Sequence, residues 1–468
     1  MTIQEILSNP AGATQIIAAL KEKPFTLRPW KGGKGLQREF YSKFHPVMDK
    51  GKYPDIVNDD GTLEEVTRIT LDLQQLAVKR MTELVCGIPV KRVHKPENNR
   101  QKEIAAWLEN IFERNRIDSV NVDRCNMLFA GCEIMTLWYA VEETNTIYGF
   151  KSPLKLRCRT FSPMLGDELY PLYDEYGDMI ALSIGYTRRK DGRNVTYFDC
   201  YTAEKHIKWS NENGDWTPIE DDDIKILKIP AIYCMRPTPI WEETSKLVYE
   251  MEWALSRNGN YLRKNSKPLF VVFADEQIQY GDEEEGEEGR SKGRGIMQYP
   301  KGSNAAYVTW QQAVENLKFY INELRNSFFT QLQLPDWSYE KMSQQAMSGE
   351  SRKQLFIDSQ LKVKDEAGRL LEFFDREVNV VKAFLKVMAP AGYEADIDAL
   401  AVENIITPFS INDDKDTISN LYTATGGKPI VSQREAVEYL GWSKDVDKTM
   451  SELEAEKQVN DLFDTGAE

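Results

Sequence analysis

The sequence contains little histidine and cysteine, which restricts the chemistry that the protein could perform. Its three histidines, His45, His94 and His206, lie far apart, and none belongs to an HxxxH or HExxH pattern. Zinc catalysis or a Ser-His-Asp triad would therefore require the convergence of distant residues. The six cysteines form no CxxC pair, which is typical of buried, reduced thiols rather than of a metal or disulfide framework.

Signals for nucleotide binding and for membrane insertion are also absent. No GxxxxGK[ST] motif is present, and no GxGxxG follows a strand-like run. No segment approaches the ~18 uninterrupted apolar residues of a membrane span. The start of the chain, MTIQEILSNPAG, lacks a basic region and a long apolar core, so we expect no secretory signal. We expect no cofactor, no bound metal and no membrane association.

Positive charge is in deficit. The chain has 59 Lys and Arg against 74 Asp and Glu, a net charge of −15. This argues against a protein that holds nucleic acid by neutralising many phosphates. It is compatible with a surface that DNA slides past, because like charges do not adhere. The 468 residues, 41% hydrophobic and 28% charged, fit a folded protein of roughly two to four domains or one large mixed unit.

Carboxylates are plentiful, and they cluster between Asp282 and Glu288 beside glycines. A contiguous, self-repelling run of this kind favours a solvated loop over a metal site, which needs ligands from separate rigid elements. The run includes Glu284 and is followed by Arg290, Lys292 and Arg294. A metal-dependent nuclease nevertheless stays open as an alternative, because the inventory of carboxylates alone does not dismiss it.

Apolar periodicity in the first half of the chain predicts helices and then strands. A helix is expected over 62–86, with Thr62 and Glu65 as a capping box, and further helices near 104–112 and over 119–130. A strand follows at 133–141, and 154–209 reads as an antiparallel β region. The first 60 residues predict an irregular arm with a short helix at 13–21, and the glycine pair at 32–33 predicts a turn.

The second half predicts two long helices, 241–265 and 311–333, around a β-bearing excursion. The strand Phe270–Phe273 either pairs with a neighbouring chain or forms a hairpin with 305–308; both remain open. A polar loop at 334–349 precedes the longest helix, 350–388, which would span roughly 58 Å. A strand at 404–411 and two or three helical pieces complete an α+β chain.

Several local signatures accompany this order of elements: Gly87–Val90, Leu128–Glu133, Tyr170–Glu175, Asp199–Glu204, Ser348–Ser351, and Ile405–Asn412 with Gly427–Lys428 and Val431–Ser432. Together, from about 60 to 460, they resemble the portal (head-to-tail connector) proteins of tailed bacteriophages, of the type found in long-tailed phages of Gram-positive hosts. Ser351 stands where alanine is commoner in that family, which is a small departure.

The resemblance implies a portal-like subunit with an α/β wing, a two-helix stem, a small clip, a long spine helix and a helical crown. It divides the chain into an arm (1–60), the wing (61–240), stem helices (241–265 and 311–333), the clip (266–310), a tunnel loop (334–349), the spine helix with a wing strand (350–411), and the crown with the C-terminal tail (412–468).

The resemblance also implies a function without catalysis. The chain would form a ring of about twelve copies at one capsid vertex and pass double-stranded DNA during packaging and ejection. Implied partners are the terminase large subunit, a head–tail adaptor and the major capsid or scaffolding protein, with assembly in the host cytoplasm and residence in the virion. The alternatives are a metal-dependent phage nuclease and another ring-forming head or tail structural protein.

Two sets of candidate residues follow from these assignments. Channel-facing candidates are Lys318 and Arg325 on the returning helix, and Lys341, Gln344, Gln345 and Met347 in the loop. For Lys318 and Arg325 an ordinary solvated or intersubunit ion pair remains open. Candidates for docking other proteins at the clip are Phe270, Val272, Glu284, Arg290, Lys292 and Arg294.

Overall fold

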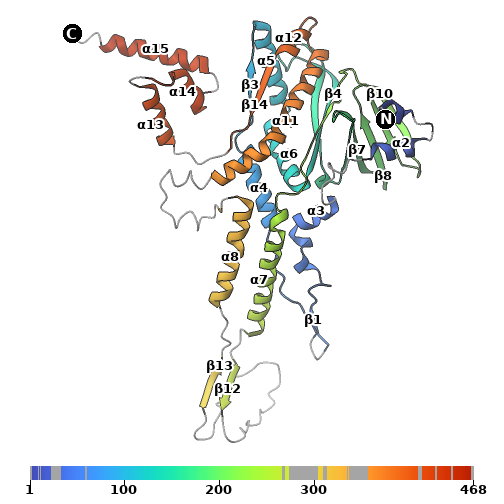
Figure 1. The fold of residues 1–468 in the computed structure, drawn as a ribbon, viewed down its shortest axis with the longest axis vertical. Helices are drawn as coiled ribbons and strands as arrows, with labels where there is room; N and C mark the ends of the chain where they lie inside the picture. Colours follow the sequence, from blue (N-terminus) through green and yellow to red (C-terminus); the bar gives the residue numbers. More distant parts are fainter. Residues whose placement is uncertain are drawn as a thin grey trace, which may run out of the picture. The chain divides into compact units, whose positions relative to one another are not determined.

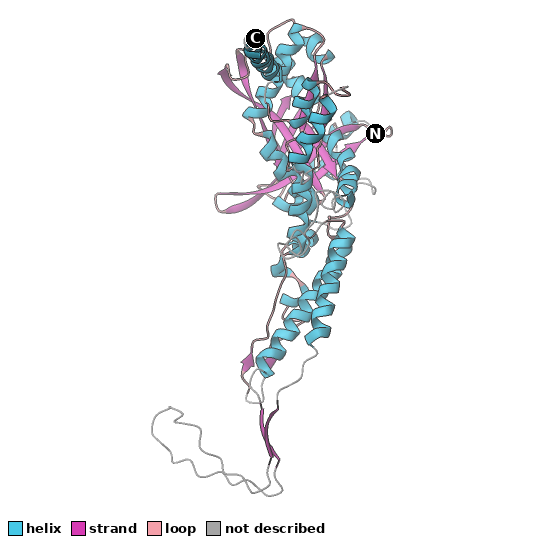
Figure 2. Ribbon diagram, turned by 90° about the vertical axis from the view of Figure 1, so that its left-hand side faces the viewer, coloured by secondary structure: helices cyan, strands magenta, loops and turns pink. Residues whose placement is uncertain are grey.

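A computed structural model gives the fold (Figures 1 and 2). It describes residues 3–8, 10, 12–22, 33–57, 61–265, 269–273, 304–308, 314–334, 336, 357–408, 414–426, 429–443 and 446–464. The chain divides into two compact units. The first comprises Met1–Pro335 with Lys362–Pro408, and the second comprises Asp336–Leu361 with Phe409–Glu468. None of the described helices is both long enough and apolar enough to cross a membrane.

Helices make up much of both units. Those of the first unit are α1 (Ile3–Leu7), α2 (Ala13–Leu20), α3 (Gly33–Phe40), α4 (Leu73–Cys86), α5 (Asn99–Arg114), α6 (Ile117–Gly131), α7 (Ser245–Asn265), α8 (Val314–Leu332), most of α11 (Ile357–Met388), and α12 (Glu394–Ala399). Those of the second are α13 (Asp414–Thr425), α14 (Gln433–Leu440) and α15 (Val446–Asp464).

The strands form antiparallel sheets, as the sequence predicted for the middle of the chain. The five-stranded sheet has the order β10 (Thr217–Asp223), β9 (Lys205–Ser210), β8 (Arg193–Tyr201), β7 (Met179–Lys190), β6 (Glu168–Tyr173). The three-stranded sheet has the order β11 (Ala231–Met235), β4 (Glu133–Asn145), β5 (Ser152–Phe161). The two-stranded sheets are β1 (Ile56–Val57) with β2 (Leu63–Glu64), β3 (Lys91–Lys95) with β14 (Ala401–Ile405), and β12 (Leu269–Phe273) with β13 (Asn304–Val308). This mixture confirms the predicted α+β class.

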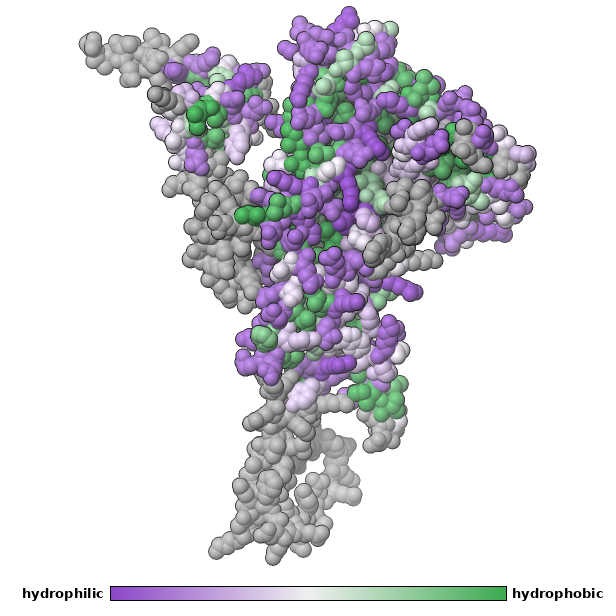
Figure 3. All heavy atoms as spheres, viewed as in Figure 1, coloured by the Kyte–Doolittle hydropathy of each residue, from purple (hydrophilic) through white to green (hydrophobic). Residues whose placement is uncertain are grey.

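The alternation of side chains along β8 shows how the five-stranded sheet is buried on both faces. Tyr201 belongs to a core shared with Leu137 and Phe161 of the three-stranded sheet. Phe198 and Cys200 point to the opposite face, which α1 and α2 cover. In the view of Figure 3, hydrophilic residues cover most of the described surface.

The N-terminal arm is therefore more ordered than predicted. Its described residues include three α-helices, where the sequence predicted one, because their apolar faces pack on the sheet and on α6. The predicted turn at 32–33 is wrong at its second residue, since Gly33 begins α3. A Cβ at Gly33 would lie 3.2 Å from Cβ of Pro163, so the close approach of α3 favours glycine there.

The predicted start of the helix at 62 is wrong, because the helix begins at Leu73. The preceding residues are extended, and Leu63 and Glu64 form β2. Alternate backbone N–H groups, those of Thr67, Ile69 and Leu71, donate hydrogen bonds to side chains of α7. An extended chain with a period of two presents these donors to one neighbour, whereas a helix would satisfy them internally.

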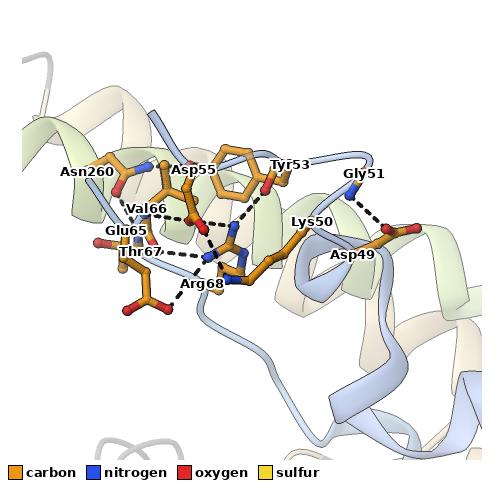
Figure 4. A network of polar contacts seen from close by, with 10 residues as sticks. All are labelled: Asp49, Lys50, Gly51, Tyr53, Asp55, Glu65, Val66, Thr67, Arg68 and Asn260. Carbon is orange, nitrogen blue, oxygen red and sulfur yellow. Dashed lines mark hydrogen bonds and ion pairs between the residues drawn. The ribbon is translucent and has the colours of Figure 1, made fainter. Parts of the chain in front are cut away.

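A network of polar contacts anchors the same extended segment (Figure 4). The guanidinium of Arg68 is nearly buried; it pairs with Asp55 at 2.8 Å and donates to the carbonyl oxygen of Tyr53 at 2.7 Å. Hydrogen bonds from Lys50 and Arg68 lower the pKa of Asp55 to about 2. The segment is therefore fixed from both sides, by this network and by α7.

Two further differences concern strands. The strand predicted at 404–411 lies earlier, at Ala401–Ile405, because it pairs with β3, and residues 409–411 lie outside the described residues. β10 was not predicted; its sequence, TPIEDDD, is exposed throughout and has no apolar alternation. Cross-strand ion pairs supply its contacts instead: Lys205 with Asp221, and Lys208 with Glu220.

Candidate functional site

The elements that the sequence singled out as functional are the α7–α8 pair and the segment that follows it. The two helices lie side by side in both ribbon views (Figures 1 and 2). The hydroxyl of Tyr320 on α8 donates to Glu250 of α7 at 3.1 Å. β12 and β13, in the chain between the helices, pair with each other in register from Leu269–Val308 to Phe273–Asn304. The hairpin interpretation of Phe270–Phe273 is thus confirmed within one chain.

One face of α7 holds the extended segment. Its acceptors Glu252, Ser256 and Asn260 recur every four residues, so they form one line along the helix. Between them, Gly259 faces Thr67, and a Cβ at Gly259 would lie 2.8 Å from Cγ2 of Thr67. Glycine is therefore required for this close approach.

A buried His45–Glu252 pair strengthens the same contact. Nδ1 of His45 lies 2.7 Å from Oε1 of Glu252, and Nε2 lies 2.9 Å from the carbonyl oxygen of Glu39. Each ring nitrogen thus faces one acceptor, an arrangement that favours the doubly protonated imidazolium. Burial acts to lower the pKa of His45, but the hydrogen bond and charge of Glu252, with the Glu39 carbonyl, raise it overall.

The candidate cations on α8 have different surroundings. Lys318 is exposed. Arg325 is half-buried, with its guanidinium 5.9 Å from the ring centre of Phe329 one turn away. The two predicted residues of β12, Phe270 and Val272, pair through their backbones with Tyr307 and Ala305.

The other predicted residues lie outside the described residues. They are Lys341, Gln344, Gln345 and Met347 of the loop, and Glu284, Arg290, Lys292 and Arg294 of the charged segment.

The two chain segments that border the predicted loop are tied to each other. Leu334, two residues after the end of α8, and Val363 of α11 are both buried. The amine of Lys362 donates to the carbonyl oxygen of Leu332, one of the last carbonyls of α8. Burial, with the nearby charge of Arg236, lowers the pKa of Lys362 to about 8. These contacts hold together the two segments that flank the predicted loop.

Arg236 adds a second connection to α11. It pairs with Glu366 of α11 at 2.6 Å and donates to the carbonyl oxygen of Thr238 at 2.6 Å. The chain entering α7 and the helix leaving the loop are therefore held by one side chain.

A buried polar cluster attaches α11 to the rest of the first unit. The guanidinium of Arg124 on α6 forms two hydrogen bonds with Glu377, at 2.6 and 2.9 Å. Nε1 of Trp138 on β4 donates to the same carboxylate at 2.9 Å. All three side chains are almost fully buried.

Sequence reasoning missed Lys362, Arg236, Glu366 and Glu377 as site-forming residues. Lys362, Glu366 and Glu377 lie in the predicted helix 350–388, whose apolar periodicity was identified, whereas Arg236 lies in a stretch for which no element was predicted. Periodicity tells which face is apolar but not which charged side chain is covered by another element, so no local signal marked them.

A comparison with family models decides the identity of this arrangement. The model described as "Phage portal protein, SPP1 Gp6-like" matches residues 35–461. The chain belongs to this family of phage portal proteins. The resemblance found in the sequence is thereby confirmed, and the family is structural rather than enzymatic, in agreement with the expectation of a protein that is not an enzyme.

Solved structures similar to this portal chain come from gene transfer agent (GTA) particles. The neck of the empty particle computed with C6 symmetry has a chain 11% identical at a TM-score of 0.41, covering 85% of this chain and 94% of that one. The neck of the native particle computed with C12 symmetry has a chain 12% identical at a TM-score of 0.41, covering 92% of this chain and 98% of that one. The virion of the native particle has a chain 10% identical at a TM-score of 0.40, covering 92% of this chain and 98% of that one. A search of curated proteins found no match.

Proposed function

We propose that this portal protein assembles into a closed ring of about twelve copies at one capsid vertex, and that double-stranded DNA passes through the ring. The observation that carries the proposal is the apolar surface of the α7–α8 pair. Leu262, Phe319 and Tyr320 are 52%, 68% and 42% exposed. Side chains of this size on a two-helix pair fit a surface that neighbouring copies cover.

In this proposal α7 and α8 are the stem, 266–310 is the clip and 334–349 is the tunnel loop. Residues 61–240 form the wing, 350–411 the spine helix with a wing strand, and 412–468 the crown. The ring would assemble in the host cytoplasm and remain in the virion.

DNA contact is assigned to the stem and the tunnel loop. The net charge of −15 limits adhesion of DNA, while isolated cations guide it. Lys318 and Arg325 would act from the stem, and Lys341, Gln344, Gln345 and Met347 from the loop. The tie between Lys362 and the end of α8 supports this role, because it holds together the two segments of the chain that flank the loop.

Docking of other proteins is assigned to the clip. The β12–β13 hairpin, with Phe270 and Val272, would present Glu284, Arg290, Lys292 and Arg294 first to the terminase large subunit and later to a head–tail adaptor. The wing would contact the major capsid or scaffolding protein.

Native mass measurement and electron microscopy test the ring. About twelve chains of 53.9 kDa give a particle of about 650 kDa. We expect Phe319→Asp to prevent assembly, because it places a charge on the covered surface. The matched control is Tyr176→Asp, at an aromatic residue 85% exposed in the β6–β7 turn, which should still assemble. A wild-type chain that stays monomeric at high concentration would overturn the proposal.

Deletion of 336–348 tests the tunnel loop and separates a portal from another ring-forming head or tail protein. We expect rings to form while DNA packaging or retention fails. Unchanged packaging would refute the assignment of this loop.

Incubation of DNA with the protein and Mg²⁺ or Mn²⁺ tests the nuclease alternative. We propose that the protein makes no covalent change to DNA, so the DNA should remain intact. Metal-dependent cleavage that co-purifies with the ring would favour the alternative.

A further inference from the structure

A pocket of about 540 Å³ in the first unit lies between the two larger sheets and α11. Its wall includes Tyr186, Asp199, Tyr201, His206 and Glu220, which come from β7, β8, β9 and β10. This volume lies in the range of small-ligand sites, and titratable side chains converge on it. None of the described residues of α7 and α8 lines the pocket.

The pairing of β9 with β10 brings three metal-ligating side chains to one face. His206 lies opposite Asp222, and Lys208 lies opposite Glu220. Directly opposite residues of an antiparallel pair share a face, and residues two apart on a strand do too. One ligand atom from each of His206, Glu220 and Asp222 lies within 4.8 Å of the others.

The imidazole of His206 is held in place and has a buried ring nitrogen that is open to a ligand. Its ring stacks on Tyr201 at 4.4 Å between centres and at an angle of 4°. Nε2 is buried and has no hydrogen-bond partner. A ring nitrogen without a hydrogen-bond partner is available as a metal ligand.

An independent observation on the neighbouring strand also points to a cation. Asp199 is 6% exposed and lines the same pocket. Its Oδ2 accepts a hydrogen bond from Tyr186 at 3.1 Å, but its buried Oδ1 has no partner. A buried carboxylate oxygen without a partner is energetically costly, and burial raises the pKa of Asp199 to about 6. A positive charge in the pocket would relieve that cost.

We propose that His206, Glu220 and Asp222 bind one Zn²⁺ ion per chain beside this pocket, whose wall His206 and Glu220 share. One imidazole and two carboxylates form a donor set that suits Zn²⁺. The amine of Lys208 lies 3.0 Å from Oε1 of Glu220, which leaves the second oxygen of that carboxylate for the ion. Bound Zn²⁺ joins the exposed edge strand β10 to β9 and adds to the ion pairs that hold it.

Titration of the untagged, full-length chain with Zn²⁺ tests the site, with Co²⁺ as a spectroscopic probe. We expect one equivalent to bind, with visible Co²⁺ absorption, and binding about 10-fold weaker or worse in His206→Ala and Asp222→Asn. The matched control is Asp221→Asn, on the same strand, with the same change of charge and on the opposite face. This variant loses the ion pair with Lys205 but keeps all three proposed ligands and the Lys208–Glu220 pair, so it should bind as the wild type does.

Hydrogen exchange gives a second readout that does not depend on the probe metal. Zn²⁺ should slow the exchange of β10 amides in the wild type and in Asp221→Asn, but not in Asp222→Asn, whose exposed side chain is not needed for folding. The proposal is overturned if Zn²⁺ binding does not saturate at one equivalent, or if Asp221→Asn weakens it as much as Asp222→Asn does.

Discussion

Replacement of Glu377 by alanine tests whether the buried cluster at α11 is as important as its geometry suggests. The Glu377 side chain is 4% exposed, and its carboxylate accepts from Arg124 and from Nε1 of Trp138. Removing it leaves a buried guanidinium and a buried indole N–H without that acceptor. Breaking one partner of such a pair lowers the free energy of unfolding by about 3–5 kcal/mol.

Urea unfolding monitored by circular dichroism provides the measurement. With a slope near 3 kcal/mol/M, the midpoint of the transition of the first unit should fall by about 1–2 M in Glu377→Ala. Glu372→Ala is the control: Glu372 also lies on α11 and also pairs with an arginine, but its side chain is 62% exposed. An exposed pair of this kind contributes at most about 1 kcal/mol.

A double variant separates the loss of a contact from the burial of an unpaired charge. Arg124→Met with Glu377→Leu removes both charges and fills the space with apolar atoms. It should be clearly more stable than Glu377→Ala alone. Our reasoning is refuted if Glu377→Ala is no less stable than Glu372→Ala, or if the double variant is less stable than the single one.

The remaining predictions concern α7 and the segments that flank the predicted loop. His45→Gln should flatten the pH dependence of stability. Because the pKa of His45 is raised in the folded state, the stability that this residue contributes is fully present below about pH 6.5 and is lost as the pH rises through the folded pKa. Midpoints of urea unfolding measured across pH 6–9 will show the difference. In the wild type the free energy of unfolding should rise between about pH 8 and pH 10.5, since the lowered pKa of Lys362 means that the unfolded chain binds more protons than the folded chain in this range. Lys362→Met should remove this rise. An unchanged pH profile would contradict the prediction. Gly259→Ala should lower the free energy of unfolding by about 1–3 kcal/mol, because its Cβ would overlap Thr67, and Thr67→Ser should recover part of the loss in the same denaturation assay.

Elements with strong internal patterns were predictable from the sequence. α8 begins and ends within a few residues of the predicted limits, because its apolar residues repeat at helical spacing. The β12–β13 hairpin was one of two open interpretations of its segment, since a strand's own residues do not say which edge it pairs with.

β10 shows the opposite case. Seven exposed residues, four of them acidic, carry no apolar alternation, so nothing in the segment itself predicts a strand. The strand exists because β9 offers a free edge and two lysines. For the same reason the cluster of His206, Glu220 and Asp222 was not foreseen: Glu220 and Asp222 lie 14 and 16 positions after His206, and only the register joins them.

The amino-acid sequence by itself determined the succession of helices and strands, the absence of known catalytic motifs, and the order of signatures by which the portal family was recognised. Only the tertiary structure decided that residues 65–72 lie outside any helix, that His45 and Glu377 are buried, and that Lys362 is half-buried. The acceptors for the backbone of Thr67, Ile69 and Leu71 lie 193, 187 and 181 positions along the chain. Local periodicity predicts the secondary structure in which a segment would satisfy its own backbone hydrogen bonds. The secondary structure that the segment adopts also depends on hydrogen-bond partners from distant parts of the chain, which only folding brings close.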